Sequence, residues 1–141
     1  MQNGTLLLGS DNVLGGASGT SVLNVNEGAD VLLEGTTQFV HGLDGLGSIN
    51  LGTGTLNLTK TAQGDQSIAN AISGDSGTLA VDLAGGSLSF ANKSSDSWAG
   101  KLELTNTLLA LTGSTEGALD AVSVAANSGV KITVDSQDKL G

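Results

Sequence analysis

The 141-residue sequence contains no cysteine, no proline, no tyrosine and no arginine. Without cysteine the chain can form no disulfide framework and offers no thiolate for catalysis or metal binding. Many secreted proteins also avoid cysteine, so this absence leaves the cellular compartment open. The aromatic residues are only Phe39, Phe90 and Trp98, which leaves few large side chains for a core or for stacking on a ligand.

Positive charge is also scarce, because five lysines stand against 14 acidic residues and the net charge is −9. Nucleic-acid binding depends on basic groups that displace phosphate counterions, so we expect no nucleic-acid partner. An acidic chain is also repelled by anionic lipid surfaces, and no stretch approaches the roughly 18 apolar residues of a membrane span. We therefore expect no direct membrane insertion.

Glycine is abundant, with 22 residues, and it separates short segments in which apolar and polar residues alternate. Such alternation predicts β-strands, and the intervening Gly, Asn, Asp, Ser and Thr predict turns. The alanine-rich segment 115–126 is also interpreted as a strand around Val122 and Val124. The other predicted strands are 4–8, 21–25, 47–51, 54–58, 77–83, 87–90, 100–104 and 128–134.

A longer phrase recurs along the chain: a small residue, a glycine, an alternating strand, a short turn and another alternating strand. It is found at 18–35, 46–59, 76–91 and 99–113. The glycines that open these phrases are spaced within the range typical of solenoid repeats. They are Gly19, Gly47, Gly77 and Gly100.

One such unit buries too few side chains to offset the entropy of ordering its backbone, so the units must stack. Stacking pairs each strand with its equivalent above and below and places like residues in internal ladders. We predict an all-β chain, a parallel β-helix of about five to six coils. The proposed ladders are Leu51, Leu83 and Leu104, and Leu58, Phe90 and Leu111.

An antiparallel β-sandwich is the alternative fold, because it also has short strands with a turn every 8–12 residues or so. Sandwiches usually rely on a core Trp, Tyr or Cys pair, and this chain is poor in all three. The repeated phrase favours the solenoid.

The segments 42–59, 71–91 and 98–112 resemble the passenger domains of bacterial autotransporters, particularly the stretch before the C-terminal barrel. That family repeats a Gly-x-Gly-x-Leu strand, a Gly-Thr-Leu-x-Leu strand and an aromatic-x-Gly start to the next coil. Here these elements are 45–51, 54–58 and 98–100. The resemblance implies a right-handed parallel β-helix, secreted by a Gram-negative bacterium and exposed at the cell surface as a stalk, an adhesin or a biofilm component.

The resemblance further implies that the C-terminal coils act as an autochaperone, which folds first and templates the rest. Two features depart from the family: its C-terminal barrel is missing from this sequence, and the usual aromatic-Thr-Gly start is here Trp98-Ala99-Gly100. We therefore expect residues 1–141 to be one β-helical fragment of a longer passenger. The implied partners are the parent's own barrel, adjoining coils, a second copy, and host surface proteins or glycans.

Gly74-Asp75-Ser76-Gly77 matches the four residues around the nucleophilic serine of chymotrypsin-like proteases. A serine hydrolase also needs a base, an acid that orients it and an oxyanion hole. His41 is the only available base, and it precedes the serine too closely for two barrels to form. The repeat instead aligns Ser76 and Gly77 with the turn at 45–47. We expect no catalytic residue and no enzyme activity.

We expect no metal site and no cofactor. His41 and Asp44 alone make a poor zinc site, and the sequence contains neither an EF-hand loop nor a glycine-rich calcium repeat. Acidic residues occur singly at turn and strand positions, which indicates a solvated face that discourages aggregation. These acids are Asp75, Asp82, Glu103 and Asp135.

Two binding hypotheses remain open. A carbohydrate-active β-helix enzyme or a glycan-binding module would need an exposed aromatic platform, and Trp98 is the only large one. An adhesive surface would need rows of hydrogen-bonding side chains on an outer face. The candidates for such rows are Asn50, Asn57, Thr59, Thr61, Asn92, Ser94, Ser95, Thr105 and Asn106.

Overall fold

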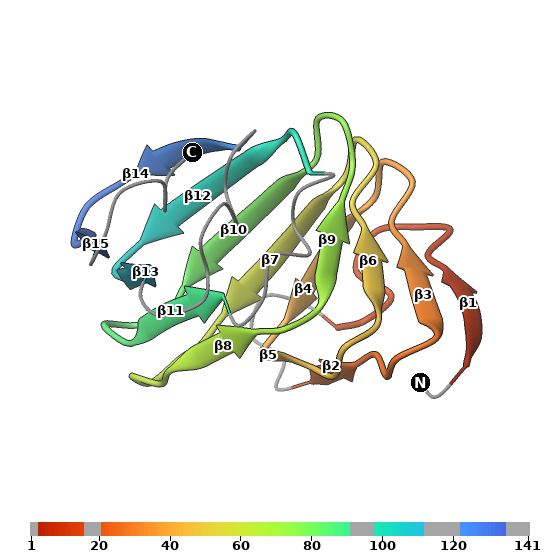
Figure 1. Ribbon diagram of the computed structural model, residues 1–141, viewed down its shortest axis with the longest axis horizontal. Helices are drawn as coiled ribbons and strands as arrows, with labels where there is room; N and C mark the ends of the chain where they lie inside the picture. The colour runs from red at the N-terminus through yellow and green to blue at the C-terminus, as the bar shows by residue number, and fades with distance from the viewer. Residues whose placement is uncertain (1–2, 16–20, 91–97, 112–121, 135–141) are drawn as a thin grey trace.

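The chain winds into a parallel β-helix of about five coils (Figure 1). The computed structural model describes residues 3–15, 21–90, 98–111 and 122–134. Among these residues there is no helix, and every paired strand runs parallel to its neighbour. The predicted all-β solenoid is therefore confirmed. The β-sandwich alternative is wrong, because it requires antiparallel pairs.

The coils build three faces. Sheet A contains, in spatial order, β1 (Gly4–Leu7), β3 (Ala29–Leu32), β6 (Ser48–Asn50) and β9 (Ala71–Ser73). Sheet C contains β14 (Ser123–Ala126), β12 (Lys101–Thr105), β10 (Thr78–Asp82), β7 (Thr55–Thr59) and β4 (Thr37–Val40). The third face combines sheet B, made of β2 (Val22–Asn24) and β5 (Gly42–Asp44), with sheet D. Sheet D contains β15 (Lys131–Val134), β13 (Leu108–Leu111), β11 (Ser87–Phe90) and β8 (Gln66–Ile68).

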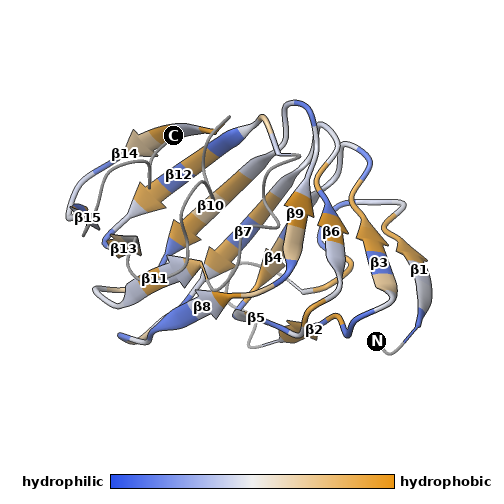
Figure 2. Cartoon of the chain, viewed as in Figure 1, coloured by the Kyte–Doolittle hydropathy of each residue, from blue (hydrophilic) through white to orange (hydrophobic). Residues whose placement is uncertain are grey.

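The core fills the space enclosed by the three faces, because alternate residues of each strand point inward. Figure 2 shows this alternation of hydrophobic and hydrophilic residues along the strands of sheet C. Successive coils place like residues on top of one another. One inward ladder runs through Leu56, Leu79 and Leu102, all with 0% exposure.

The first predicted ladder is wrong in its pairing and the second is wrong in its first member, although all members whose side chains the structure describes are buried. Leu51 directly follows β6, as Leu33 follows β3, whereas Leu83 directly follows β10. Leu104 pairs with Val81, which pairs with Leu58 in sheet C. In the second ladder the parallel register that pairs Ser89 with Ala110 brings Phe90 into line with residue 111 in sheet D, as predicted, but the preceding member is Ile68 and not Leu58. The physical reason is that one coil holds three strands, whereas the repeated phrase contains only two.

The glycines predicted to open the repeat do not all occupy the same corner of the β-helix. Gly54, Gly77 and Gly100 precede β7, β10 and β12 at one corner of the helix, and the strands they precede are in register. Gly47 instead precedes β6 at a different corner. Gly19 lies outside the described residues.

Most of the predicted strands are confirmed. The segments 4–8, 21–25, 47–51, 54–58, 77–83, 87–90, 100–104 and 128–134 coincide to within one residue with, or contain, β1, β2, β6, β7, β10, β11, β12 and β15. The strand interpreted around Val122 and Val124 is confirmed in part: Val124 belongs to β14, Val122 precedes it, and residues 115–121 lie outside the described ranges. The strands β3 and β13 were covered only by the longer repeated phrase, and β4, β5, β8 and β9 were not recognised, because three or four residues give too few alternations to stand out.

Candidate functional site

The Gly-Asp-Ser-Gly sequence forms the corner between sheets A and C. Asp75 and Ser76 lie in an exposed bend between β9 and β10. Gly74 has φ = 130°, and a Cβ atom there would lie 2.9 Å from the backbone nitrogen of Gly52. A Cβ atom on Gly77 would overlap the Cβ of Leu51. The close approach of successive coils therefore accounts for both glycines without any catalytic role.

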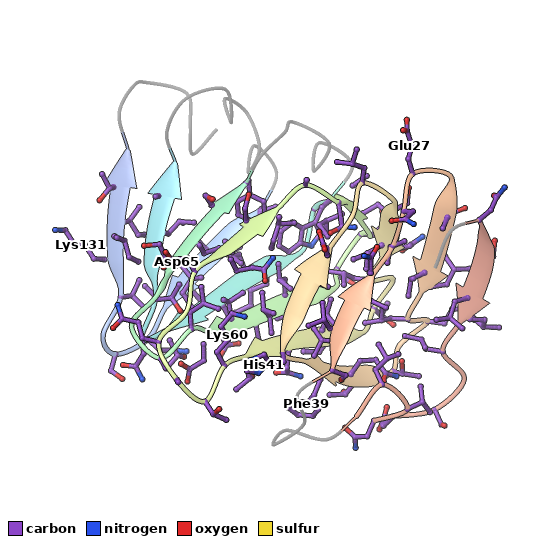
Figure 3. The ribbon with its side chains drawn as sticks, turned by 90° about the horizontal axis from the view of Figure 1, so that it is seen from below. Glu27, Phe39, His41, Lys60, Asp65 and Lys131 are labelled. Carbon is purple, nitrogen blue, oxygen red and sulfur yellow. The ribbon has the colours of Figure 1, made fainter. Side chains whose placement is uncertain are left out.

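His41 lies at a different corner, between β4 of sheet C and β5 of sheet B. Its backbone N–H donates to the Ser21 carbonyl at 2.7 Å, and its own carbonyl accepts from Lys60 Nζ at 2.8 Å (Figure 3). The width of sheet C separates this corner from Ser76. The fold does not bring the single histidine to the candidate nucleophile.

Trp98 is fully buried, with 0% exposure. Its indole N–H donates to the Gly77 carbonyl at 3.1 Å, and its backbone forms a β-bridge with Gly74. The Trp98 side chain is therefore packed inside the core, where it links two successive coils. Trp98 offers no exposed platform for a sugar ring, which the glycan hypothesis needed.

Of the four predicted solvated acids, Asp82 and Glu103 contact neighbouring groups. Asp82 accepts from the Ala84 backbone N–H at 3.0 Å. Asp44, which was considered only as a zinc ligand, accepts from the Gly45 backbone N–H at 2.8 Å. Glu103 lies 3.5 Å from Lys101 Nζ. Asp75 is exposed, and Asp135 lies outside the described residues. Within the ranges that the structure describes, no three acidic, histidine or cysteine side chains gather in a way that could hold a metal ion.

The polar residues considered for adhesion are distributed over several surfaces. Asn50 lies in sheet A, and Asn57, Thr59 and Thr105 lie on the outer side of sheet C, all half-buried. Asn57 Nδ2 donates to the Gln38 carbonyl at 3.2 Å, so it is engaged within the sheet. The remaining candidates divide into exposed residues and residues outside the described ranges: Thr61 and Asn106 are exposed, and Asn92, Ser94 and Ser95 are not described.

Two shallow polar hollows occur on the described surface. One, of about 410 Å³, lies at the corner that carries Asp75 and is lined also by Asn50, Thr53 and Ser73. The other, of about 180 Å³, lies on sheet C over Ala80. Asn57, Thr59, Asp82, Glu103 and Thr105 surround it. Both hollows offer hydrogen bonds and carboxylates, but neither is lined by an aromatic or a histidine side chain.

Three buried amide side chains form the most distinctive polar feature, and the sequence reading missed all of them. Gln66 Nε2 donates to the Leu43 carbonyl at 2.7 Å, while its Oε1 accepts from the Leu43 backbone N–H at 3.3 Å. The side chain thereby mimics a peptide group and joins β8 to β5. Asn70 Nδ2 is within 3.5 Å of three carbonyls, those of Val25, Asp44 and Gly47.

The third of these amides belongs to Gln38, which has 0% exposure. Its Nε2 donates to the Ser10 carbonyl at 2.8 Å, and its Oε1 accepts from the backbone N–H of Val13 at 3.1 Å. If the register between coils is known, the burial of Gln38 and Gln66 can be predicted, because each glutamine aligns with buried leucines of the following coils.

No family model, curated protein or solved structure was found to match this chain. In the described part of the chain, no helix has the length and apolar character needed to cross a membrane.

Proposed function

We propose that this chain is a non-enzymatic segment of a secreted, cell-surface autotransporter passenger, serving as a β-helical stalk and folding module. The observation that supports the proposal is the uninterrupted parallel ladder of sheet C, which runs from β4 to β14 through every full coil. Such a ladder gives an extended, axially hydrogen-bonded rod. Each coil adds about 4.8 Å of length, so about five coils add roughly 24 Å.

The chemistry of the described side chains is consistent with a scaffold. Ser76 and His41 occupy different corners, and Trp98 is buried. Hydrolytic and glycan-stacking functions would each need one of these groups in an accessible, assembled site. A stalk needs only a packed core and a polar surface.

A cell-surface location can be tested directly with an antibody raised against the 141-residue chain. In the organism that makes the chain, the antibody should label intact, unpermeabilised cells, and protease added from outside should remove that label. A cytoplasmic protein of the same cells serves as the control and should stay unlabelled. Labelling that appears only after permeabilisation would contradict the proposed location.

The folding role predicts a directional effect on refolding rates, which a matched pair of substitutions can measure. Leu102 in β12 and Leu33 after β3 both have 0% exposure, so alanine at either position should cost about 2–5 kcal/mol of stability. If the C-terminal coils fold first, Leu102→Ala should slow refolding by up to about a hundredfold, whereas Leu33→Ala should mainly speed unfolding.

The measurement is stopped-flow refolding and unfolding from denaturant, followed by Trp98 fluorescence. Each variant is the control for the other, because the substitution and the burial are the same. Slow refolding of Leu33→Ala together with normal refolding of Leu102→Ala would place the nucleus in the N-terminal coils. That result would remove the autochaperone role from this proposal.

A further inference from the structure

Asn3 lies directly before β1, and its side chain is exposed (Figure 1). It is the only one of the ten asparagines in this sequence that is followed by glycine. An asparagine side chain can close a ring onto the backbone nitrogen of the next residue, and a glycine there has no Cβ atom to obstruct the approach. The Asn3-Gly4 pair therefore offers the least hindered route to such a reaction in this chain.

The side chain of Asn3 is already folded back onto the nitrogen of Gly4. Asn3 Oδ1 accepts from the Gly4 backbone N–H at 2.9 Å. This contact holds the side-chain amide group beside the nitrogen that would attack it, and reacting groups need to lie about 3–3.5 Å apart. Gly4 has φ = 98°, and a Cβ atom there would meet no atom within 4 Å, so the space around the pair is open.

Other asparagine side chains are held by hydrogen bonds between coils. Asn57, Asn70 and Asn127 each donate from Nδ2 to groups of a neighbouring coil. Ring closure at any of these positions must first break those contacts. The fold therefore protects these three amides, whereas the hydrogen bond of Asn3 to Gly4 joins the two groups that react.

Asn12 provides an internal comparison, because it is exposed as Asn3 is. The residue after it is Val13, and the Val13 backbone N–H donates to the buried Gln38 Oε1 at 3.1 Å. That hydrogen bond commits the nitrogen to a partner in the core. The branched Val13 side chain adds a steric obstacle.

Asp44 makes the same kind of contact as Asn3, since its Oδ1 accepts from the Gly45 N–H at 2.8 Å. Ring closure at a carboxyl group must expel water instead of ammonia, and it needs the carboxyl to be protonated. A Cβ atom on Gly45 would also overlap the Val25 carbonyl, so the neighbouring coil encloses this position. We expect Asp44 to stay unmodified under conditions in which Asn3 reacts.

We propose that Asn3 is a site of spontaneous modification, at which the chain converts its own amide to isoaspartate through the Gly4 nitrogen. The Gly4 nitrogen bonds to Cγ of Asn3, the bond from Cγ to Nδ2 breaks, and Nδ2 leaves as ammonia with the proton that the Gly4 nitrogen gives up. The product is a cyclic succinimide. Water then opens the ring at either of its carbonyl carbons, which gives isoaspartate or aspartate, and no oxidant, reductant or cofactor is consumed.

Either product adds a carboxylate to a chain whose net charge is already −9. Asn3 Oδ1 lies 3.8 Å from the position that a Cβ atom on Gly28 would take, so the new charge stands beside the turn that carries the exposed Glu27. The isoaspartate product also routes the main chain through the former side chain directly before β1. It is a substrate for enzymes that methylate isoaspartate, which gives the modified chain a specific chemical label.

The test incubates the folded 141-residue chain at mildly alkaline pH, where the attacking nitrogen loses its proton more readily. Digestion with pepsin in acid, followed by mass spectrometry, locates each amide that has become an acid. An isoaspartate methyltransferase with a labelled methyl donor identifies isoaspartate. Asn3 should convert at least about tenfold faster than any other asparagine that the structure describes. Asn3→Gln should remove the label, because glutamine would need a larger ring.

Val13→Gly is the matched variant, because it gives Asn12 the same following residue as Asn3. Gln38 still holds the backbone N–H at position 13, so in the folded variant Asn12 should convert at least about tenfold more slowly than Asn3. In denaturant the two asparagines should convert at similar rates. Equal rates in the folded variant would overturn the proposal, because the sequence alone would then select the site.

The original chain supplies a second criterion, which holds even if Val13→Gly does not fold. Asn3 should convert at least as fast in the folded chain as in the chain unfolded by denaturant at the same pH. Conversion that is much slower in the folded chain would mean that the fold protects Asn3, and the proposal would be wrong.

Discussion

Replacing Gly100 by alanine is expected to destabilise the fold by about 3 kcal/mol or more, and to lower its melting temperature by roughly 10 °C. A Cβ atom at this position would overlap the Gly77 carbonyl oxygen and lie 2.6 Å from Trp98 Nε1. The carbonyl belongs to the backbone of the neighbouring coil and accepts hydrogen bonds from the Lys101 N–H and the Trp98 indole. It cannot move without breaking both.

The control for this substitution is Gly9→Ala. A Cβ atom on Gly9 meets no atom within 4 Å, and its φ lies outside the left-handed region, so the change should stay within about 0.5 kcal/mol. Thermal unfolding followed by circular dichroism compares the two variants, and Trp98 emission reports whether the indole stays buried. Equal melting temperatures for the two variants would contradict the stacking contact at this corner.

Much of the fold could be predicted from the sequence, because its signals are local and repeated. Strict alternation in segments such as 77–83 and 100–104 identifies strands. The recurrence of a glycine before these strands predicts stacking, since a lone coil cannot stabilise itself. The identity of the buried leucines followed from the same alternation, and 0% exposure of Leu51, Leu83 and Leu104 confirms it.

The register between coils could not be predicted in the same way, because the turns differ in length from coil to coil. Gly47 and Gly77 both precede a strand, yet they lie at different corners. An alignment based on glycine alone therefore paired Leu51 with Leu83, which follow strands of different sheets. Side-chain ladders become visible only once three strands are assigned to each coil.

The reading of the Gly-Asp-Ser-Gly sequence as a turn did follow from the sequence, because the sole histidine was poorly placed. The sequence did not, however, predict why positions 74 and 77 are glycine. Gly74 approaches the Gly52 backbone and Gly77 approaches Leu51, and both contacts lie between coils. Contacts across the stack join residues that are far apart in the chain, so no local pattern reveals them.

The buried amides were missed for a related reason. Glutamine and asparagine are normally exposed, and a reading by composition places them on the outer surface. Gln66 stands in the ladder position of Leu88 and Leu109, at the strand where sheet D ends. Its role depends on the absence of a direct backbone ladder between β5 and β8. The missing ladder between β5 and β8 can be recognised only once the register of the strands is known.

Gln66→Ala is the second substitution with a large expected effect, a loss of about 3–5 kcal/mol. It leaves the N–H and the carbonyl of Leu43 without their side-chain partner in a buried region, and it opens a cavity beside Leu88. Each unsatisfied buried polar group costs about 1–3 kcal/mol. Chemical denaturation followed by circular dichroism measures the loss.

A comparison with Gln66→Leu separates packing from hydrogen bonding. Leucine extends the apolar ladder toward Leu88 and fills the cavity, but it restores neither hydrogen bond to Leu43, so its loss should fall between those of the alanine variant and the original chain. Gln63→Ala, at an exposed position, should change stability by no more than about 0.5 kcal/mol. Full stability of Gln66→Leu would mean that the amide contributes nothing to joining β8 and β5. Equal losses for leucine and alanine would instead assign the whole effect to the two hydrogen bonds with the Leu43 backbone.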